Sequence, residues 1–137
     1  MSLDPAAVIR GFGAGLAAAA AMMGIQALAW TRWGHRAVFE WTEAEAGTVR
    51  LLGHKSFRAA LVLNLLAGGV AGIVFALGLA LLAATPTAVL GAAFGSLMWV
   101  ITLIIHEPVT GDPARGAGVP ISLVSHLAYG ALLGAFA

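Results

Sequence analysis

The sequence predicts an all-α membrane protein with four transmembrane helices in two repeated hairpins, plus an interfacial amphipathic helix between the first two. The first observation behind this prediction is a set of four apolar runs, at residues 6–30, 57–84, 87–106 and 118–137. A helix needs about 20 apolar residues to cross a hydrocarbon core of roughly 30 Å. The second observation is composition, since 61% of the 137 residues are hydrophobic and 9% are charged. With a mean hydropathy of +0.96, the chain is expected to form one integral membrane domain.

The first apolar run resembles a signal peptide, because residues 27–29 read Ala-Leu-Ala, as at a cleavage site. The run is nevertheless longer than the apolar part of a signal peptide, and Asp4 precedes the lone Arg10. We therefore expect a retained helix. Its core of glycine and alanine makes a smooth surface that lets neighbouring backbones come close, which favours a central place in the bundle.

Residues 31–56 form the connector that carries most of the charge. On a helix, one face would hold Trp30, Trp33, Val38 and Trp41, and the other Arg32, Arg36, Glu40 and Glu43. This pattern predicts an amphipathic helix in the membrane interface, with Trp30, Trp33 and Trp41 as anchors at headgroup level and a solvated charged face. Residues 42–45 resemble a capping box that starts a second short helix. The alternative is a solvated loop with a few aromatic anchors.

Prolines mark the ends of the later spans. Pro86 lies in the short turn 84–87, which predicts that the second and third spans form a tight antiparallel hairpin. Pro108 is expected to end the third span at His106, and the connector 107–117 reads as a loop. Pro120 suits the first turn of the fourth span.

The distribution of Lys and Arg predicts the orientation. The 30–58 connector holds five of these residues and the 107–117 connector holds Arg115, whereas the opposite side has only Arg10. The positive-inside rule therefore places both connectors in the cytoplasm and both termini outside.

Each span contains a Gly-x-x-x-Gly pair, which predicts tight helix packing. The pairs, in chain order, are Gly11 and Gly15, Gly68 and Gly72, Gly91 and Gly95, and Gly130 and Gly134. The second and fourth spans also match from a polar residue, Asn64 or His126, through a following Leu to the glycine pair. These matches indicate a parallel internal repeat with pseudo-twofold symmetry. Because 18 glycines are present, a chance match is the alternative.

Three stretches carry a resemblance to a known family. Residues 95–99, the proline-bearing connector and above all Ser-His-Leu-Ala-Tyr-Gly-Ala-Leu-Leu-Gly at 125–134 look like the YagU-like family. The resemblance implies a small four-span inner-membrane protein, and it supplies no catalytic residues. The tryptophan-rich connector is the part that matches least.

His126 and Asn64 are the main polar residues expected within the membrane. His126 should lie about 12 Å below the start of its span, counted at 1.5 Å per residue from Gly118. An ionisable group at that depth is a functional candidate, with Asn64, Ser122 and Ser125 as candidate partners. The structural alternative is a neutral histidine that holds two helices together by a hydrogen bond.

His106 and His126 lie toward the same leaflet, so together they are candidates to bind a haem iron or the magnesium of a chlorophyll-type pigment. No Cys-x-x-Cys-His haem-attachment motif and no zinc motif occurs in the sequence. His35 and His54 are expected to be solvated or interfacial.

The leading functional hypothesis is a non-enzymatic membrane protein that acts through helix packing, either as a homo-oligomer or as an accessory subunit of a larger membrane complex. No nucleophile–base pair or nucleotide-binding fingerprint supports an enzyme, and a net charge of +1 gives no argument for nucleic acid. A haem- or pigment-binding electron-transfer subunit that uses His106 and His126 is one alternative. A pathway for protons or a small solute around Asn64 and His126 is the other.

Overall fold

The computed structural model describes residues 4–137, and every regular element in that range is a helix. The elements are α1 (Pro5–Trp33), the 3-10 turn η1 (His35–Ala37), α2 (Phe39–Leu52), α3 (Phe57–Leu81), α4 (Ala88–Thr110) and α5 (Gly118–Phe136). Four of them, α1, α3, α4 and α5, are long and apolar enough to cross a membrane. The prediction of an all-helical, four-span membrane protein is therefore confirmed.

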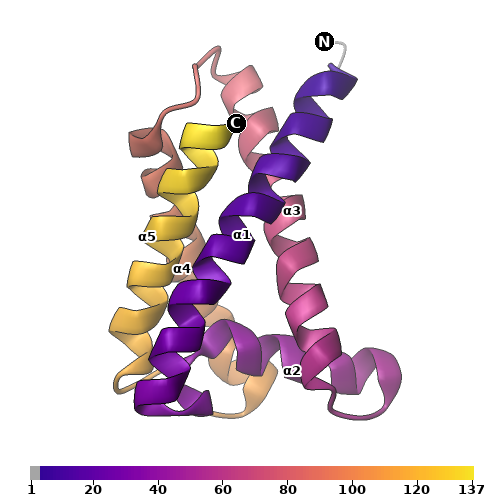
Figure 1. The fold of residues 1–137 in the computed structure, drawn as a ribbon, viewed down its shortest axis with the longest axis vertical. Coiled ribbons are helices and arrows are strands. Elements are labelled where there is room, and N and C mark those ends of the chain that lie inside the picture. The colour runs from indigo at the N-terminus through magenta and orange to yellow at the C-terminus, as the bar shows by residue number, and fades with distance from the viewer. Residues whose placement is uncertain (1–3) are drawn as a thin grey trace.

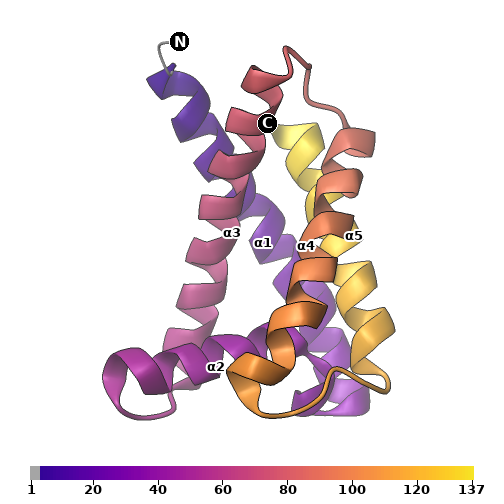
Figure 2. The same ribbon diagram turned by 180° about the vertical axis from the view of Figure 1, so that it is seen from behind.

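The four long helices run beside one another, and α2 lies across one end of the bundle (Figure 1). Both termini are at the opposite end, whereas the connector between α4 and α5 is at the same end as α2 (Figures 1 and 2). The bundle therefore has one end closed by a transverse helix and one end formed by the termini and the α3–α4 turn.

The long helices pack mainly in two pairs, α1 with α3 and α4 with α5, and α1 also packs against α5. The glycines of α1 and α3 lie where the first pair comes closest. A Cβ atom at Gly15 would overlap the backbone carbonyl oxygen of Gly68. One at Gly72 would overlap the carbonyl oxygen of Gly11. Because no side chain separates the backbones there, this crossing is much closer than an ordinary helix contact.

The second pair, α4 with α5, crosses in the same way. A Cβ atom at Gly91 would overlap the carbonyl oxygen of Gly130, and one at Gly95 would overlap the carbonyl oxygen one turn earlier on α5. One at Gly134 would overlap the carbonyl oxygen of Thr87, the residue that caps the start of α4. The glycine pairs of all four spans therefore face a neighbouring helix of the same chain.

Helices α3 and α4 are consecutive, but they separate toward α2 (Figure 2). Near their short connector they touch through Phe75 and Phe94, whose ring centroids are 5.3 Å apart. The expected antiparallel hairpin is therefore closely packed only near its turn. The reason is that the glycine surface of α3 packs against α1 and that of α4 against α5, so neither is available for close packing between α3 and α4.

The connector after α1 differs from the sequence prediction. Helix α1 continues to Trp33 and ends at Gly34, whose φ of 83° favours glycine. Trp30 and Trp33 therefore belong to α1 rather than to one amphipathic helix with Trp41. Helix α2 runs unbroken through Thr42, whose hydroxyl donates to the Phe39 carbonyl at 2.8 Å, so the predicted capping box is wrong.

Helix α4 continues past Pro108 to Thr110 and ends at Gly111, whose φ is 81°. The expected end at His106 is wrong by about one turn. Proline removes a backbone donor, but only the last turn lies beyond it. There the Thr110 hydroxyl donates to the His106 carbonyl at 2.7 Å.

Candidate functional site

A cavity of about 420 Å³ lies between the helices on the side where α3 and α4 separate. Its apolar walls include Met22, Leu63, Ala67, Ala71, Met98 and Ile101. Its polar lining consists of Glu40, Glu43, Asn64, Thr102, His126 and Tyr129. Ala67 on α3 and Ile101 on α4 line the cavity and are also exposed to solvent or lipid, so the cavity opens between these two helices. Its volume is in the range of sites that hold small organic molecules.

Helix α2 brings Glu40 into the interior of the bundle, where the residue is only 6% exposed. The Gln26 amide donates to Oε2 of Glu40 at 2.9 Å, and the Ser122 hydroxyl donates to Oε1 at 2.6 Å. The indole N–H of Trp41 donates to Oε1 of Gln26 at 2.8 Å. Because an indole nitrogen can only donate, this bond fixes the Gln26 amide with its NH₂ toward Glu40.

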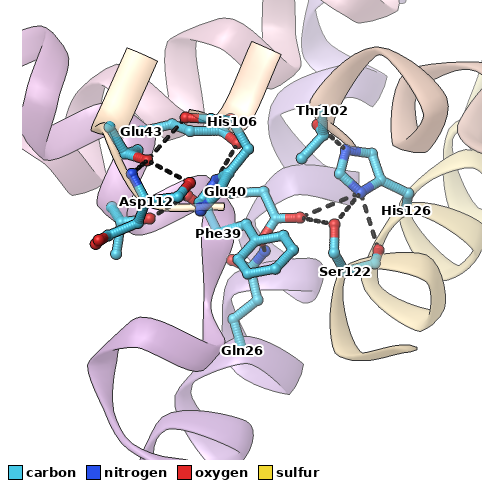
Figure 3. Close-up of polar contacts among 11 residues, drawn as sticks. Gln26, Phe39, Glu40, Glu43, Thr102, His106, Asp112, Ser122 and His126 are labelled. Atoms are coloured by element: carbon cyan, nitrogen blue, oxygen red, sulfur yellow. Dashed lines mark hydrogen bonds and ion pairs between the residues drawn. The ribbon is translucent and has the colours of Figure 1, made fainter. Parts of the chain in front are cut away.

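His126 joins three helices through its two ring nitrogens (Figure 3). Its Nδ1 atom lies 2.9 Å from the backbone carbonyl oxygen of Ser122 and 3.2 Å from Oε1 of Glu40. Both neighbours are acceptors, so Nδ1 carries a proton. The Nε2 atom lies 3.3 Å from the hydroxyl of Thr102 on α4. The ring is therefore held in one orientation at the polar end of the cavity.

The surroundings of Glu40 favour its charged form. Burial by itself raises the pKa of the Glu40 carboxyl group. The hydrogen bond and charge of His126, together with the hydrogen bond from Ser122, lower this pKa by more than burial raises it. The resulting pKa of Glu40 is below its ordinary value. Glu40 is therefore a carboxylate at neutral pH, with donors on both of its oxygens.

Glu43, three positions later on α2, is in a different state. Burial, and secondly the nearby charge of Glu40, raise the pKa of Glu43 to about 8. Its Oε1 atom lies 2.9 Å from Nδ1 of His106 on α4. At neutral pH the Glu43 carboxyl group therefore keeps its proton, and with the tautomer of His106 that leaves Nδ1 as an acceptor it donates this proton to the ring nitrogen. The two carboxyl groups of α2 thus line one cavity in opposite protonation states.

His106 also lines a second hollow of about 180 Å³, at the end of the bundle near the α4–α5 connector. This hollow is lined by Arg36, Phe39, Thr42, His106, Asp112, Pro113 and Arg115. The Phe39 ring packs against the His106 ring with centroids 4.1 Å apart. His106 therefore lies between the cavity and the connector end of the protein. It contacts the cavity-lining residue Glu43 on one side and lines the second hollow on the other.

The two histidines that were candidates for a haem or pigment do not face a common space. His126 lines the cavity and contacts Glu40, whereas His106 lines the second hollow and contacts Glu43. Within residues 4–137, no group of three or more potential metal-ligating side chains comes together. The arrangement does not favour a cofactor held between the two rings.

Asn64 and His126, matched by the internal repeat, line the same cavity. Nδ2 of Asn64 is buried and has no hydrogen-bond partner among the described residues. Ser122 contacts His126 as expected, but the buried hydroxyl of Ser125 has no partner in the described part of the chain. Tyr129 completes this end by donating to the Gly68 carbonyl at 2.6 Å.

The sequence predicts a solvated face for Glu40 and Glu43, and it offers Gln26 only as one of the few polar residues of the spans, without a partner. The prediction is wrong for Glu40, which is buried together with its neighbours Phe39 and Trp41. Phe39 and Trp41, the chain neighbours of Glu40, gave no signal of this burial, because adjacent residues of a helix point to different faces. Trp41 is only 4% exposed, whereas Trp30 and Trp33 are 42% and 57% exposed. Of the three predicted anchors, Trp41 is therefore buried, and Trp30 and Trp33 are exposed.

In comparisons with known proteins, no family model, no curated protein sequence and no solved structure matches this chain.

Proposed function

We propose that this membrane protein is a non-enzymatic binding protein for a small lipophilic molecule, which it takes up from the bilayer into the cavity between α3 and α4. The observation that carries the proposal is the cavity itself. It combines apolar walls that open toward the lipid-facing surface with a cluster of polar groups from α2, α3, α4 and α5. Small-molecule sites commonly combine apolar walls with a few placed polar groups.

The polar lining supports a ligand rather than a purely structural network. Glu40 and His126 are paired with each other. In contrast, Nδ2 of Asn64 is a buried hydrogen-bond donor without a partner among the described residues. A buried polar group without a hydrogen bond is costly. A ligand that carries a hydrogen-bond acceptor would pair with this donor while its apolar body lies against Ala67, Ala71 and Met98.

The proposal is tested with Nile red, an uncharged lipophilic dye, and the protein in lipid nanodiscs. Ala71→Trp should fill the cavity and abolish saturable Nile red binding. Val74→Trp is the matched control, because Val74 lies on the same helix, is 53% exposed and does not line the cavity. Saturable binding that is equal in both variants would contradict the proposal.

We also propose that both connectors face the cytoplasm and both termini face outward, in the inner cell membrane. The five Lys and Arg residues of the 30–58 connector and Arg115 support this orientation. The chain has no cysteine, so His54→Cys and Thr85→Cys each introduce a single thiol. A membrane-impermeant maleimide should label Thr85→Cys in intact cells, and His54→Cys only after lysis.

The hypothesis of an accessory subunit or homo-oligomer remains a prediction. The glycine pairs that motivated it are used within the chain, for example Gly91 against Gly130 and Gly72 against Gly11, so they do not mark a free surface. Mass spectrometry of the protein purified in mild detergent tests the hypothesis. A stoichiometric partner or a defined oligomer would support it, and a monomer of 13.9 kDa would contradict it.

We further propose membership of the YagU-like family and an ancestral duplication of one hairpin. The support for the family is the stretch 125–134 together with residues 95–99. The support for the duplication is that α1 with α3 and α4 with α5 both cross at glycines. The first halves of the hairpins would then be α1 and α4, and the second halves α3 and α5.

A further inference from the structure

We propose, building on the binding function above, that the ligand is a lipophilic cation and that Glu43 exchanges its proton for this cation. The cation enters between α3 and α4 and pairs with the Glu43 carboxylate. The displaced proton passes to His106 and leaves through the second hollow at the connector end.

Glu43 is suited to exchange because its hydrogen bonding is incomplete, unlike that of Glu40. Both oxygens of Glu40 accept bonds, from Gln26, Ser122 and His126. Among the described residues, the carboxyl group of Glu43 has one polar contact, Nδ1 of His106 at 2.9 Å, and it lines the cavity directly. A ligand can therefore replace the proton of Glu43 without breaking the network around Glu40.

The charges around the cavity favour a cation. Helix α2 contributes the Glu40 and Glu43 carboxyl groups, α4 contributes His106 beside Glu43, and α5 contributes His126. Among the described residues, helices α1 and α3 bring the uncharged Gln26 and Asn64 to this region. With Glu40 already held by Gln26, Ser122 and His126, ionisation of Glu43 adds a further negative charge in an apolar space, which a bound cation neutralises.

The position of His106 supplies a path for the proton. Its Nδ1 atom contacts Glu43 on the cavity side, and the residue lines the second hollow with Asp112, Arg36 and Arg115. In the exchange, the O–H bond of Glu43 breaks, Nδ1 of His106 takes the proton, and the other ring nitrogen releases one to water. One cation enters and one proton leaves, so the charge of the site is unchanged.

The raised pKa of Glu43, about 8, sets the expected pH dependence. Below this pH the cation must displace a proton, so its affinity should fall about tenfold for each unit of decrease in pH. Above it the carboxylate is already free and the affinity should be constant. A permanent cation such as tetraphenylphosphonium has no proton of its own, so any pH dependence comes from the protein.

The experiment measures tetraphenylphosphonium binding in nanodiscs between about pH 6 and about pH 9, with proton release followed by an indicator dye in weak buffer. Wild type should release one proton per cation below about pH 8. Glu43→Gln should lose both the proton release and the pH dependence, yet still bind Nile red. Glu45→Gln is the matched control on the same helix, because Glu45 contacts His35 instead of lining the cavity.

His106→Gln should keep Nile red binding but slow the proton release after rapid mixing by at least about tenfold, because the relay is gone. Cation binding that is independent of pH in wild type, or unchanged pH dependence in Glu43→Gln, would overturn the exchange. Nile red binding without tetraphenylphosphonium binding would overturn the exchange and leave the proposed function standing. Failure of both probes to bind wild type would overturn both proposals.

Discussion

The Nδ1 atom of His126 on α5 lies 3.2 Å from Oε1 of Glu40 on α2. This contact ties the transverse helix to the interior of the bundle, and both residues are more than nine-tenths buried. Because Gln26 and Ser122 also donate to Glu40, α1, α2 and α5 meet at one carboxylate.

Removing one partner of this contact should destabilise the protein strongly. His126→Ala leaves the buried Glu40 charge without its main partner, and we expect a loss of about 3 to 5 kcal/mol in the free energy of unfolding. The double variant Glu40→Leu/His126→Leu should lose less than either single leucine variant, because no buried charge is left unpaired. Unfolding in detergent checks this, and strictly additive effects would contradict the coupling.

Gln26→Leu should weaken the same network by a different route. The Trp41 indole loses its acceptor at 2.8 Å and Glu40 loses a donor at 2.9 Å. Leaving such buried groups unpaired costs about 1 to 3 kcal/mol each. The variant should unfold at lower temperature. In contrast, Thr31→Val removes a bond from an exposed hydroxyl to the Leu28 carbonyl and should have little effect.

Gly91→Ala should disrupt the pairing of α4 with α5. The added Cβ atom would overlap the Gly130 carbonyl oxygen, which belongs to rigid backbone, and overpacking costs about 1 to 3 kcal/mol. Gly13→Ala is the control, because nothing lies within 4 Å of the new atom. Since alanine is favoured over glycine in a helix by about 0.5 to 1 kcal/mol, Gly13→Ala should stabilise the protein. Equal effects at the two positions would contradict the close crossing.

The stability of the protein should depend on pH through Glu43. Burial and the charge of Glu40 raise the pKa of Glu43 from 4.5 to about 8 in the folded state, so between these values the folded protein binds a proton that the unfolded chain does not. The contribution of protonated Glu43 to the free energy of unfolding is therefore fully present below about pH 4.5, and it is lost as the pH rises through about 8. Glu43→Gln should remove this part of the pH dependence, as measured by thermal unfolding across that range.

Several features of the fold could be predicted from the sequence because they depend on local properties. Length and hydrophobicity identified the four spans, and the glycine pairs lie at the close helix crossings, as at Gly15 and Gly130. Helix ends were less predictable. Helix α1 passes the end expected near Trp30 because no residue breaks it before Gly34, and α4 continues past Pro108 for the last two residues of its final turn.

The polar site depended on contacts between residues far apart in the chain. Asn64 and His126 were identified as polar residues within the membrane, but Glu40 was assigned to a solvated face. A helical pattern shows which side chains share a face and does not show what that face packs against. Glu40 is 82 positions from Ser122, its hydrogen-bond donor.

The sequence by itself therefore determined that this is a membrane protein of four packed helices, because apolar length and glycine spacing act within each helix. The position of α2 across one end of the bundle, with two carboxyl groups directed inward, depends on contacts between helices. The same holds for the separation of α3 and α4, which leaves a cavity between them. The physical reason is that a buried charge is tolerated only where donors from other helices surround it, and here they come from Gln26, Ser122 and His126.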